Sequence, residues 1–215
     1  MKKKWIVILA SCLLLLSACG GHADSVETAA PAQPKTVAPL PADVSVDALD
    51  NCTFAAAFEA SDVYVREGDL VISLAPYYTP KYDGADIASL AVGDTLVVGG
   101  ENVAVQSIQQ SENCISINGG YENDGYDLYP QEDGTYCWAV IDVGSEYVPL
   151  GEVTLSVDPD FVFVDNSDPQ SPGLQITAGD FLMAMQNRTD SFSPNATRVR
   201  TANGKIVELT KNYMP

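Results

Sequence analysis

Basic residues are scarce in this chain of 215 residues, and histidine is almost missing. Lys and Arg number 11 against 29 Asp and Glu, so the formal net charge is −18 at pH 7. Because such an acidic surface repels nucleic-acid phosphates, we expect no nucleic-acid partner. The single histidine, His22, lies close to the N-terminus. We therefore expect no histidine-dependent catalysis in the folded part of the chain.

Several motifs that carry enzyme chemistry are also missing. The sequence contains no Cys-x-x-Cys pair, no Walker-type glycine loop, no Gly-x-Ser-x-Gly elbow and no His-Glu-x-x-His motif. Thiol redox enzymes, zinc sites, P-loop nucleotide sites and serine hydrolases of the elbow type therefore lose support. The sequence assigns no catalytic residue, and it favours a binding or structural protein over an enzyme.

An export signal is present at the N-terminus. Lys2–Lys4 precede an apolar run, Trp5–Leu16, which is too short to span a hydrocarbon core about 30 Å thick. The run ends in residues 16–19, Leu-Ser-Ala-Cys, which resemble the lipobox of bacterial lipoproteins. The resemblance implies that Cys19 receives a diacylglyceryl group on its sulfur and becomes the mature N-terminus. It also implies an anchor in the cell membrane, with the protein on the extracytoplasmic face.

The sequence predicts three segments. Residues 1–18 form the lipoprotein signal peptide, and their removal takes away three Lys and no acid, so anionic headgroups repel the mature chain. Residues 19–50 combine the lipidated Cys with a Pro- and Ala-rich stretch without aromatic residues, which predicts a disordered tether. Residues 51–215 form a β-rich extracytoplasmic domain. An alternative divides it into a β subdomain, 51–165, and a helix with a hairpin, 166–215.

The fold prediction rests on short β-prone runs separated by turn residues. From Val153 to Val157, apolar and polar residues alternate, as in a strand with one face in water. Residues 177–185 predict a short helix, and Asn203-Gly204 between two β-prone runs predicts a hairpin with a type I′ turn. We expect a mainly β fold, an antiparallel sandwich or small barrel-like sheets, with one short helix and a C-terminal β-hairpin.

A second resemblance concerns the mature domain. Residues 90–95 follow a Leu-x-Val-Gly-Asp-Thr pattern that recurs in β-barrel-like modules. The end of the chain, with Asn-Gly-Lys-Ile-Val at 203–207 and a Tyr-Met-Pro terminus, is similar to uncharacterised lipoproteins of gut Firmicutes. These motifs are structural, so the resemblance implies neither a catalytic residue nor a ligand.

Charge is distributed unevenly along the sequence. No Lys or Arg occurs between Lys81 and Arg188, whereas acidic residues recur throughout that stretch, and basic residues outnumber acidic ones from Arg188 onward. In one interpretation the basic C-terminal end packs beside acidic strands and partly neutralises them. In the other, the remaining acids attract cations or a basic partner.

Two acidic clusters are candidate Ca²⁺ sites. The first consists of Glu122, Asp124 and Asp127, and the second of Asp158, Asp160, Asp165 and Asp168. Carboxylates at short spacing are ligands that Ca²⁺ uses, but neither cluster has the EF-hand spacing. Asp is also a residue that turns prefer, so the alternatives are a calcium site and ordinary turn chemistry. No other cofactor is expected.

Cysteines and tyrosines leave further alternatives open. Cys52, Cys114 and Cys137 remain after processing, and the last two lie in β-prone runs that make them a candidate disulfide. The alternative is that all three are small buried hydrophobic residues. Four tyrosines between residues 121 and 136 are either a platform that stacks a sugar ring or half-buried strand residues.

The favoured function is a membrane-anchored extracytoplasmic module that binds a ligand or has a structural role at the cell envelope. Its ligand is an unidentified envelope component, glycan or protein, and the membrane is reached through the N-terminal lipid. One alternative is a carboxylate-based envelope enzyme that acts on glycans, which requires two carboxylates facing each other in a pocket. The other is a Ca²⁺-stabilised surface adhesion module. The sequence carries no signal for an oligomeric state.

Overall fold

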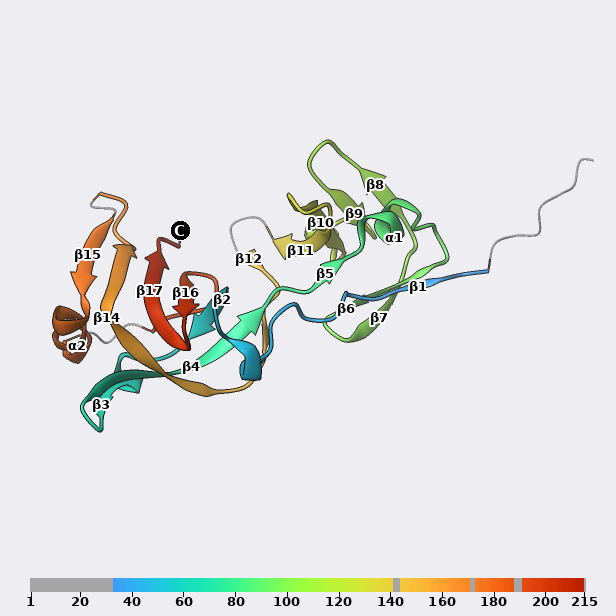
Figure 1. Ribbon diagram of the computed structural model, residues 1–215. Coiled ribbons are helices and arrows are strands. Elements are labelled where there is room, and N and C mark those ends of the chain that lie inside the picture. Colours follow the sequence, from blue (N-terminus) through green and yellow to red (C-terminus); the bar gives the residue numbers. More distant parts are fainter. Residues whose placement is uncertain (1–32, 141–143, 171–172, 188–190, 215) are drawn as a thin grey trace, which may run out of the picture. The chain divides into compact units, whose positions relative to one another are not determined.

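The computed structural model describes residues 33–140, 144–170, 173–187 and 191–214. The chain divides into two units, Met1–Gln33 and Pro34–Pro215, and the helices and strands of the described residues belong to the second. Most of these elements are strands, so the prediction of a mainly β chain is confirmed (Figure 1). None of the helices in the described ranges is long and apolar enough to cross a membrane. The signal peptide, Cys19 and residues 20–32 lie outside the described residues.

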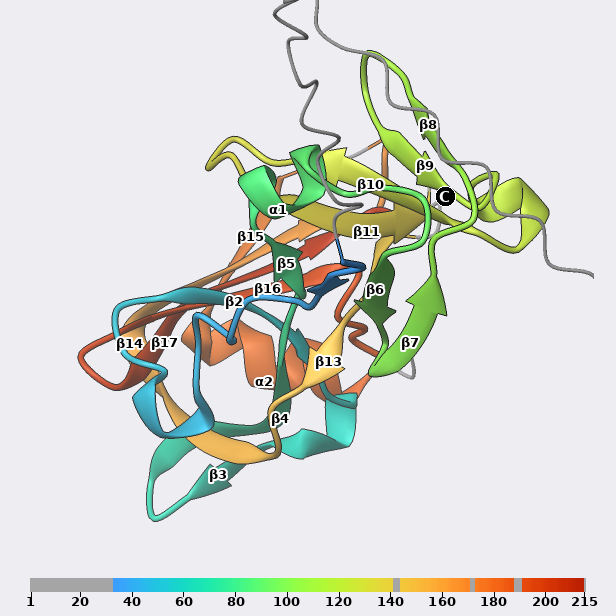
Figure 2. The same ribbon diagram turned by 90° about the vertical axis from the view of Figure 1, so that its right-hand side faces the viewer.

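Five strands of the largest sheet close into a small barrel. They are, in order of pairing, β4 (Asp69–Tyr78), β2 (Thr53–Ala57), β16 (Thr197–Ala202), β17 (Lys205–Asn212) and β14 (Val153–Asn166). The ring closes because β14 also pairs with β4. Figure 2 shows β2, β16, β17 and β14 running beside one another. The expected barrel-like sheet is confirmed, although β14 and β17 run parallel while the other pairs of the ring are antiparallel.

The barrel interior holds the first hydrophobic core. Its largest side chains include Phe54, Ile72, Leu74, Phe161, Phe163, Val199, Ile206 and Leu209, all buried. The predicted short helix is α2 (Ala178–Gln186), which packs on β14. The ring of Phe181 contacts the rings of Phe161 and Phe163, with centroids 5.1 Å apart in both pairs. Burial of these aromatic rings therefore joins the helix to the sheet.

The C-terminal hairpin takes the predicted form. Asn203 and Gly204 both have positive φ, 52° and 72°, as a type I′ turn between β16 and β17 requires. The N–H of Gly204 donates to Oδ1 of Asp50 at 2.7 Å. Because β16 and β17 lie between β2 and β14, residues from both sides of position 165 share one core. The structure therefore does not divide the chain at residue 165.

Three strands and two short helices complete this part of the chain. β3 (Val63–Arg66) and β13 (Val148–Pro149) pair with β4, and β15 (Leu174–Thr177) pairs with β14. The 3₁₀ helix η1 (Val46–Ala48) precedes β2, and η2 (Ala60–Asp62) connects β2 to β3.

A second hydrophobic core lies between two smaller sheets. The antiparallel sheet contains β12 (Gly144–Ser145), β11 (Tyr136–Val140), β10 (Tyr126–Pro130), β9 (Ile115–Ile117) and β8 (Ile108–Gln110), with β5 (Lys81–Tyr82) paired to β11. The other sheet contains β1 (Thr36–Val37), β6 (Thr95–Val98) and β7 (Glu101–Ala104). The short helices are α1 (Gly84–Ala88) and η3 (Tyr121–Asn123). Tyr82 is fully buried here, and its hydroxyl donates to the carbonyl of Val97 at 2.8 Å.

Residues 34–50 correct the predicted tether. β1 pairs in parallel with β6, and Val37 is 2% exposed while Leu49 is 6% exposed. The carboxylate of Asp94 accepts the N–H of Lys35 at 2.9 Å. That bond and a second one from the N–H of Ala91 lower the pKa of Asp94. The composition of residues 19–50 suggested disorder, but two apolar anchors and a strand pairing fix the segment from Pro34 onward.

Candidate functional site

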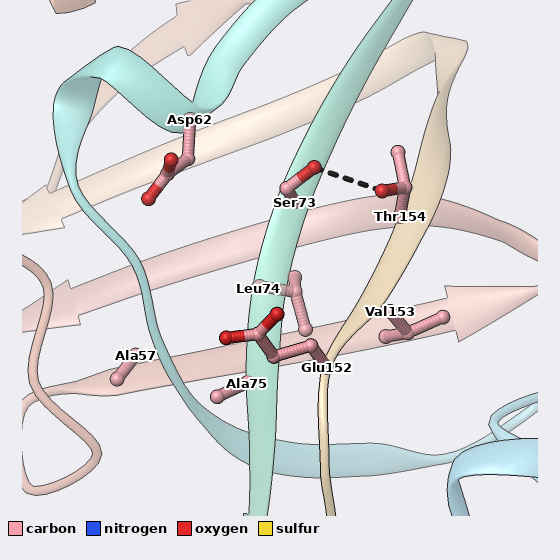
Figure 3. A pocket seen from close by; sticks show the side chains of 8 residues that line it. All are labelled: Ala57, Asp62, Ser73, Leu74, Ala75, Glu152, Val153 and Thr154. Atoms are coloured by element: carbon pink, nitrogen blue, oxygen red, sulfur yellow. Dashed lines mark hydrogen bonds between the residues drawn. The ribbon is translucent and has the colours of Figure 1, made fainter.

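A pocket of about 400 Å³ lies on the outer surface of the barrel, where β4 meets β14 (Figure 3). We call it the β4 pocket; its lining residues are Ala57, Asp62, Ser73, Leu74, Ala75, Glu152, Val153 and Thr154. The volume falls within the range of about 300–1,000 Å³ that is usual for small-molecule sites. Because Ile72 and Leu74 point into the core, the alternating residues Ser73 and Ala75 face outward.

The pocket arises from a change of strand partner along β4. On one side of β4, β2 pairs with residues 75–77 and β3 pairs with residues 69–72, so Ser73 and Leu74 fall between the two pairings. η2 carries the chain across this gap. Ala57 and Ala75 lie opposite each other in the β2–β4 register. Their small side chains leave the space that the pocket occupies.

A chain of three hydroxyl groups crosses the sheet at the pocket. The Ser73 and Thr154 hydroxyl oxygens are 2.8 Å apart, and the Tyr64 hydroxyl lies 3.2 Å from that of Ser73. The three residues come from β4, β14 and β3, which are adjacent strands. The hydrogen bond with Ser73 lowers the pKa of the exposed Tyr64 phenol. Since hydroxyls both donate and accept, this surface can pair with either kind of polar group.

Two carboxylates complete the lining. Asp62 comes from η2 on one side of β4, and Glu152, which immediately precedes β14, lies on the other side (Figure 3). Oδ2 of Asp62 accepts the N–H of Glu59 at 2.8 Å in a reciprocal capping box, which fixes its orientation. Glu152 is exposed. None of the eight lining residues is basic. The pocket therefore offers acceptors and negative charge and opposes an anionic ligand.

A carboxyl group with a raised pKa lies elsewhere. Burial raises the pKa of Glu146, although a hydrogen bond from the N–H of Gly99 acts in the opposite direction. Its Oε2 is buried without a hydrogen-bond partner, and so is Nε1 of Trp138, whose carbonyl accepts the N–H of Glu146 at 3.4 Å. Glu146 lines a separate hollow with Tyr78 and Val97. Glu146, with its raised pKa, thus lies in a different site from Asp62 and Glu152 of the β4 pocket.

The first candidate calcium cluster forms local structure. Asp127 accepts the hydroxyl of Ser116 at 2.5 Å and the N–H of Tyr121 at 3.1 Å. Asp124 ends η3 in the left-handed conformation with φ 59°, and both Asp124 and Glu122 are exposed. These side chains therefore shape a turn, in line with the alternative given by the sequence.

The second cluster also supports turns. Asp158, Asp165 and Asp168 each accept the backbone N–H two residues further along the chain, at 2.9, 3.0 and 2.8 Å. Asp160 is exposed. Throughout the described ranges, no group of three or more His, Cys, Asp or Glu side chains is arranged to hold a metal ion. Neither cluster is assembled into a calcium site in this part of the chain.

The candidate disulfide between Cys114 and Cys137, one of two alternatives left open by the sequence, is not formed. Cys52, Cys114 and Cys137 are all free. Cys137 lies opposite Tyr129 of β10, and β9, which follows Cys114, pairs with the other edge of β10. Two strand spacings amount to about 9.6 Å, which exceeds the limit of about 7 Å between Cα atoms for a disulfide. Burial raises the pKa of the Cys137 thiol.

The tyrosines near residue 121 do not form one platform. Tyr126 and Tyr136 pack against the second core, and the ring of Tyr126 meets Trp138 edge-on with centroids 5.6 Å apart. Burial raises the pKa of Tyr129. Tyr121 is 53% exposed. Three of the four are therefore strand residues that pack at the sheet, as the alternative interpretation proposed.

The basic C-terminal residues make mixed contacts. Nη2 of Arg200 pairs with Oε2 of Glu208 at 2.8 Å, inside the hairpin itself. A guanidinium N–H of Arg198 donates to the hydroxyl of Tyr147 at 2.8 Å, and the ammonium of Lys211 lies 4.7 Å from the ring centre of Phe192. The Arg200–Glu208 pair thus neutralises one acidic side chain of the hairpin itself. The acidic lining of the β4 pocket is not balanced by any basic lining residue.

Comparisons with known proteins leave the site to be interpreted from its own chemistry. No protein-family model matches the chain, no curated protein matches it, and no solved structure matches it. No sequence motif indicates the β4 pocket, because its polar residues come from separate stretches of the chain and are brought together by strand pairing. The hydrogen bond between Ser73 and Thr154, for example, joins residues 81 positions apart.

Proposed function

We propose that this chain is a lipid-anchored extracytoplasmic binding module of the cell envelope, and that its ligand binds in the β4 pocket. The observation that carries the anchoring is the position of Cys19, at the end of an apolar run and ahead of the folded unit that begins at Pro34. In the sequence, 14 residues separate Cys19 from Pro34.

Electrostatics supports the lipid as the means of attachment. The whole chain has a net charge of −18 even with the three Lys of its signal segment, so anionic headgroups repel the folded unit. Two or three acyl chains anchor a protein stably, because each buried methylene contributes about 0.8 kcal/mol. A closed barrel with an outward-facing pocket suits a binding role, since a rigid scaffold holds its polar groups in place before the ligand arrives.

A detergent phase-partitioning experiment with Cys19→Ala tests the anchoring. The unaltered protein should enter the detergent phase and incorporate labelled fatty acid, and Cys19→Ala should remain in the aqueous phase without label. Cys12→Ala is the matched control, because it removes the other cysteine of the signal segment and should behave like the unaltered protein. Fatty-acid labelling of Cys19→Ala, or its retention in the detergent phase, would refute the proposal.

The second candidate is a carboxylate-based envelope enzyme that acts on glycans. It is favoured by one observation, the presence of Asp62 and Glu152 in the same pocket. If it is correct, the protein should shorten an envelope glycan, and Glu152→Gln should abolish that activity. No observation on the described residues favours a Ca²⁺-stabilised adhesion module, because the candidate carboxylates there take part in turns.

A further inference from the structure

We infer that the β4 pocket binds an amino sugar, a ring that carries hydroxyl groups together with a free ammonium group. The inference rests on the proposed binding function and names the chemical class of its ligand. Three features carry it: a chain of hydroxyl groups along one wall, carboxylates on both sides of β4, and an exposed aromatic ring beside the pocket.

The hydroxyl chain selects for a polyhydroxylated ligand. Tyr64, Ser73 and Thr154 hydrogen-bond to one another in a row, so each hydroxyl keeps unused capacity to donate or accept. A sugar presents vicinal hydroxyls that also donate and accept. A ligand with apolar groups in their place would displace water from this remaining capacity without replacing its hydrogen bonds, which is costly.

The carboxylates select for a positive charge. Asp62 and Glu152 line the pocket without a basic residue beside them, and capping holds Asp62 in position. Hydrogen bonds between an ammonium group and a carboxylate are roughly twice as strong as those between neutral groups. The acidic balance of the whole chain adds a field that attracts cations and repels anions. Phosphate- and carboxylate-bearing ligands are therefore disfavoured.

The floor and the edge of the pocket fit a ring. Ala57 and Ala75 provide a floor of small side chains, and the cavity volume of about 400 Å³ accommodates a sugar unit. Tyr64 is 37% exposed, and its hydroxyl reaches Ser73, so its ring lies next to the pocket. The C–H face of a sugar ring can pack on such an aromatic ring. A simple amine would use the carboxylates but neither the hydroxyl chain nor this ring.

Calorimetric titration of the full chain in detergent micelles tests the inference. The probes are a β-1,4-linked glucosamine trisaccharide, the N-acetylglucosamine trisaccharide of the same length, and spermidine. The glucosamine trisaccharide should bind more tightly than both others. Glu152→Gln should weaken its binding roughly 10- to 100-fold, because a charge-assisted hydrogen bond is lost. Glu122→Gln, which removes the same charge from an exposed site outside the pocket, should stay within about twofold.

Every other outcome overturns the inference. Absence of binding, equal affinity for the acetylated trisaccharide, equal affinity for spermidine, or unchanged affinity of Glu152→Gln would each do so. Glu152 is exposed, so its substitution should leave the fold intact, and a thermal melt of the variant verifies this. Anchoring is measured independently, through Cys19. A protein that enters the detergent phase but does not bind the trisaccharide would refute the ligand class alone.

Discussion

Deletion of residues 34–50 should destabilise the folded unit severely, although their composition resembles that of a flexible linker. The perturbation compares a chain that begins at Pro34 with one that begins at Asn51. The shorter chain loses β1, which pairs with β6, and two buried side chains. Leu49 packs in the barrel core and Val37 in the second core, so both cores lose a contact.

The magnitude follows from burial. Val37 is 2% exposed and Leu49 is 6% exposed, and full burial of such a side chain is worth about 1.5–3 kcal/mol. The two together contribute about 3–6 kcal/mol, before the strand pairing is counted. Because a domain is stable by only about 5–15 kcal/mol in all, the shorter chain should lose much of its stability.

Urea unfolding followed by tryptophan fluorescence and by circular dichroism measures the difference. The chain that begins at Asn51 should unfold at a much lower urea concentration, or be unfolded without urea. Val37→Ala in the longer chain should account for part of the loss, and Thr36→Ala, at an exposed position on the same strand, is the matched control. Equal free energies of unfolding for the two chains, to within about 1 kcal/mol, would refute the reasoning.

Three further predictions concern single groups. Glu146→Gln should stabilise the protein at neutral pH, because burial raises the pKa of Glu146 in the folded state and so disfavours its charged form. The gain should vanish as the pH falls below the unfolded value of about 4.5, and thermal melts across this range measure it. Alkylation of the denatured, unreduced protein should label Cys52, Cys114 and Cys137; an unlabelled pair of cysteines would contradict the free thiols. Ca²⁺ should not raise the melting temperature above its value in EDTA, because Asp158, Asp165 and Asp168 hold turns; a clear rise would restore the calcium hypothesis.

Local signals predicted the elements that local chemistry determines. Asn203-Gly204 adopts positive φ at little cost, and apolar and polar residues alternate in the flanking strands. About ten neighbouring residues were therefore enough to predict the C-terminal hairpin. The helix α2 was predicted in the same way, from the polar residues at its N-terminus and the apolar run at 181–185. In both cases the interactions that decide the structure lie close together in the sequence.

The closure of the barrel could not be read from the sequence. Runs at 153–157 and 161–164 look like two strands, yet they form one strand of 14 residues, β14. Its pairing with β17 shifts register between Val157 and Val162, and there the carboxylate of Asp158 accepts the N–H of Asp160. Asp158 and Asp160, two of the candidate metal ligands, thus belong to an irregularity in a strand. β14 also pairs in parallel with β17, which is distant in the sequence. The alternation of apolar and polar residues within each strand does not show which distant strands pair.

The candidate site was hidden for a related reason. A motif concentrates functional residues in one stretch, whereas Asp62, Ser73 and Glu152 come from three stretches of the chain. No single stretch distinguishes these residues from the many surface acids and hydroxyls of this sequence. Only the change of strand partner along β4 brings them together, and that change depends on which strands pair.

The pocket and the barrel depend on the same pair of strands. Ser73 and Thr154 lie opposite each other in the β4–β14 register, and this pairing closes the barrel. Their hydroxyls also form part of the pocket wall. Strand closure therefore fixes the spacing of the polar groups, so little conformational entropy is lost when a ligand binds. A loop without strand partners would not hold these hydroxyl groups at a fixed spacing. The physical basis of the proposed binding function is thus the closure of the barrel beneath the pocket.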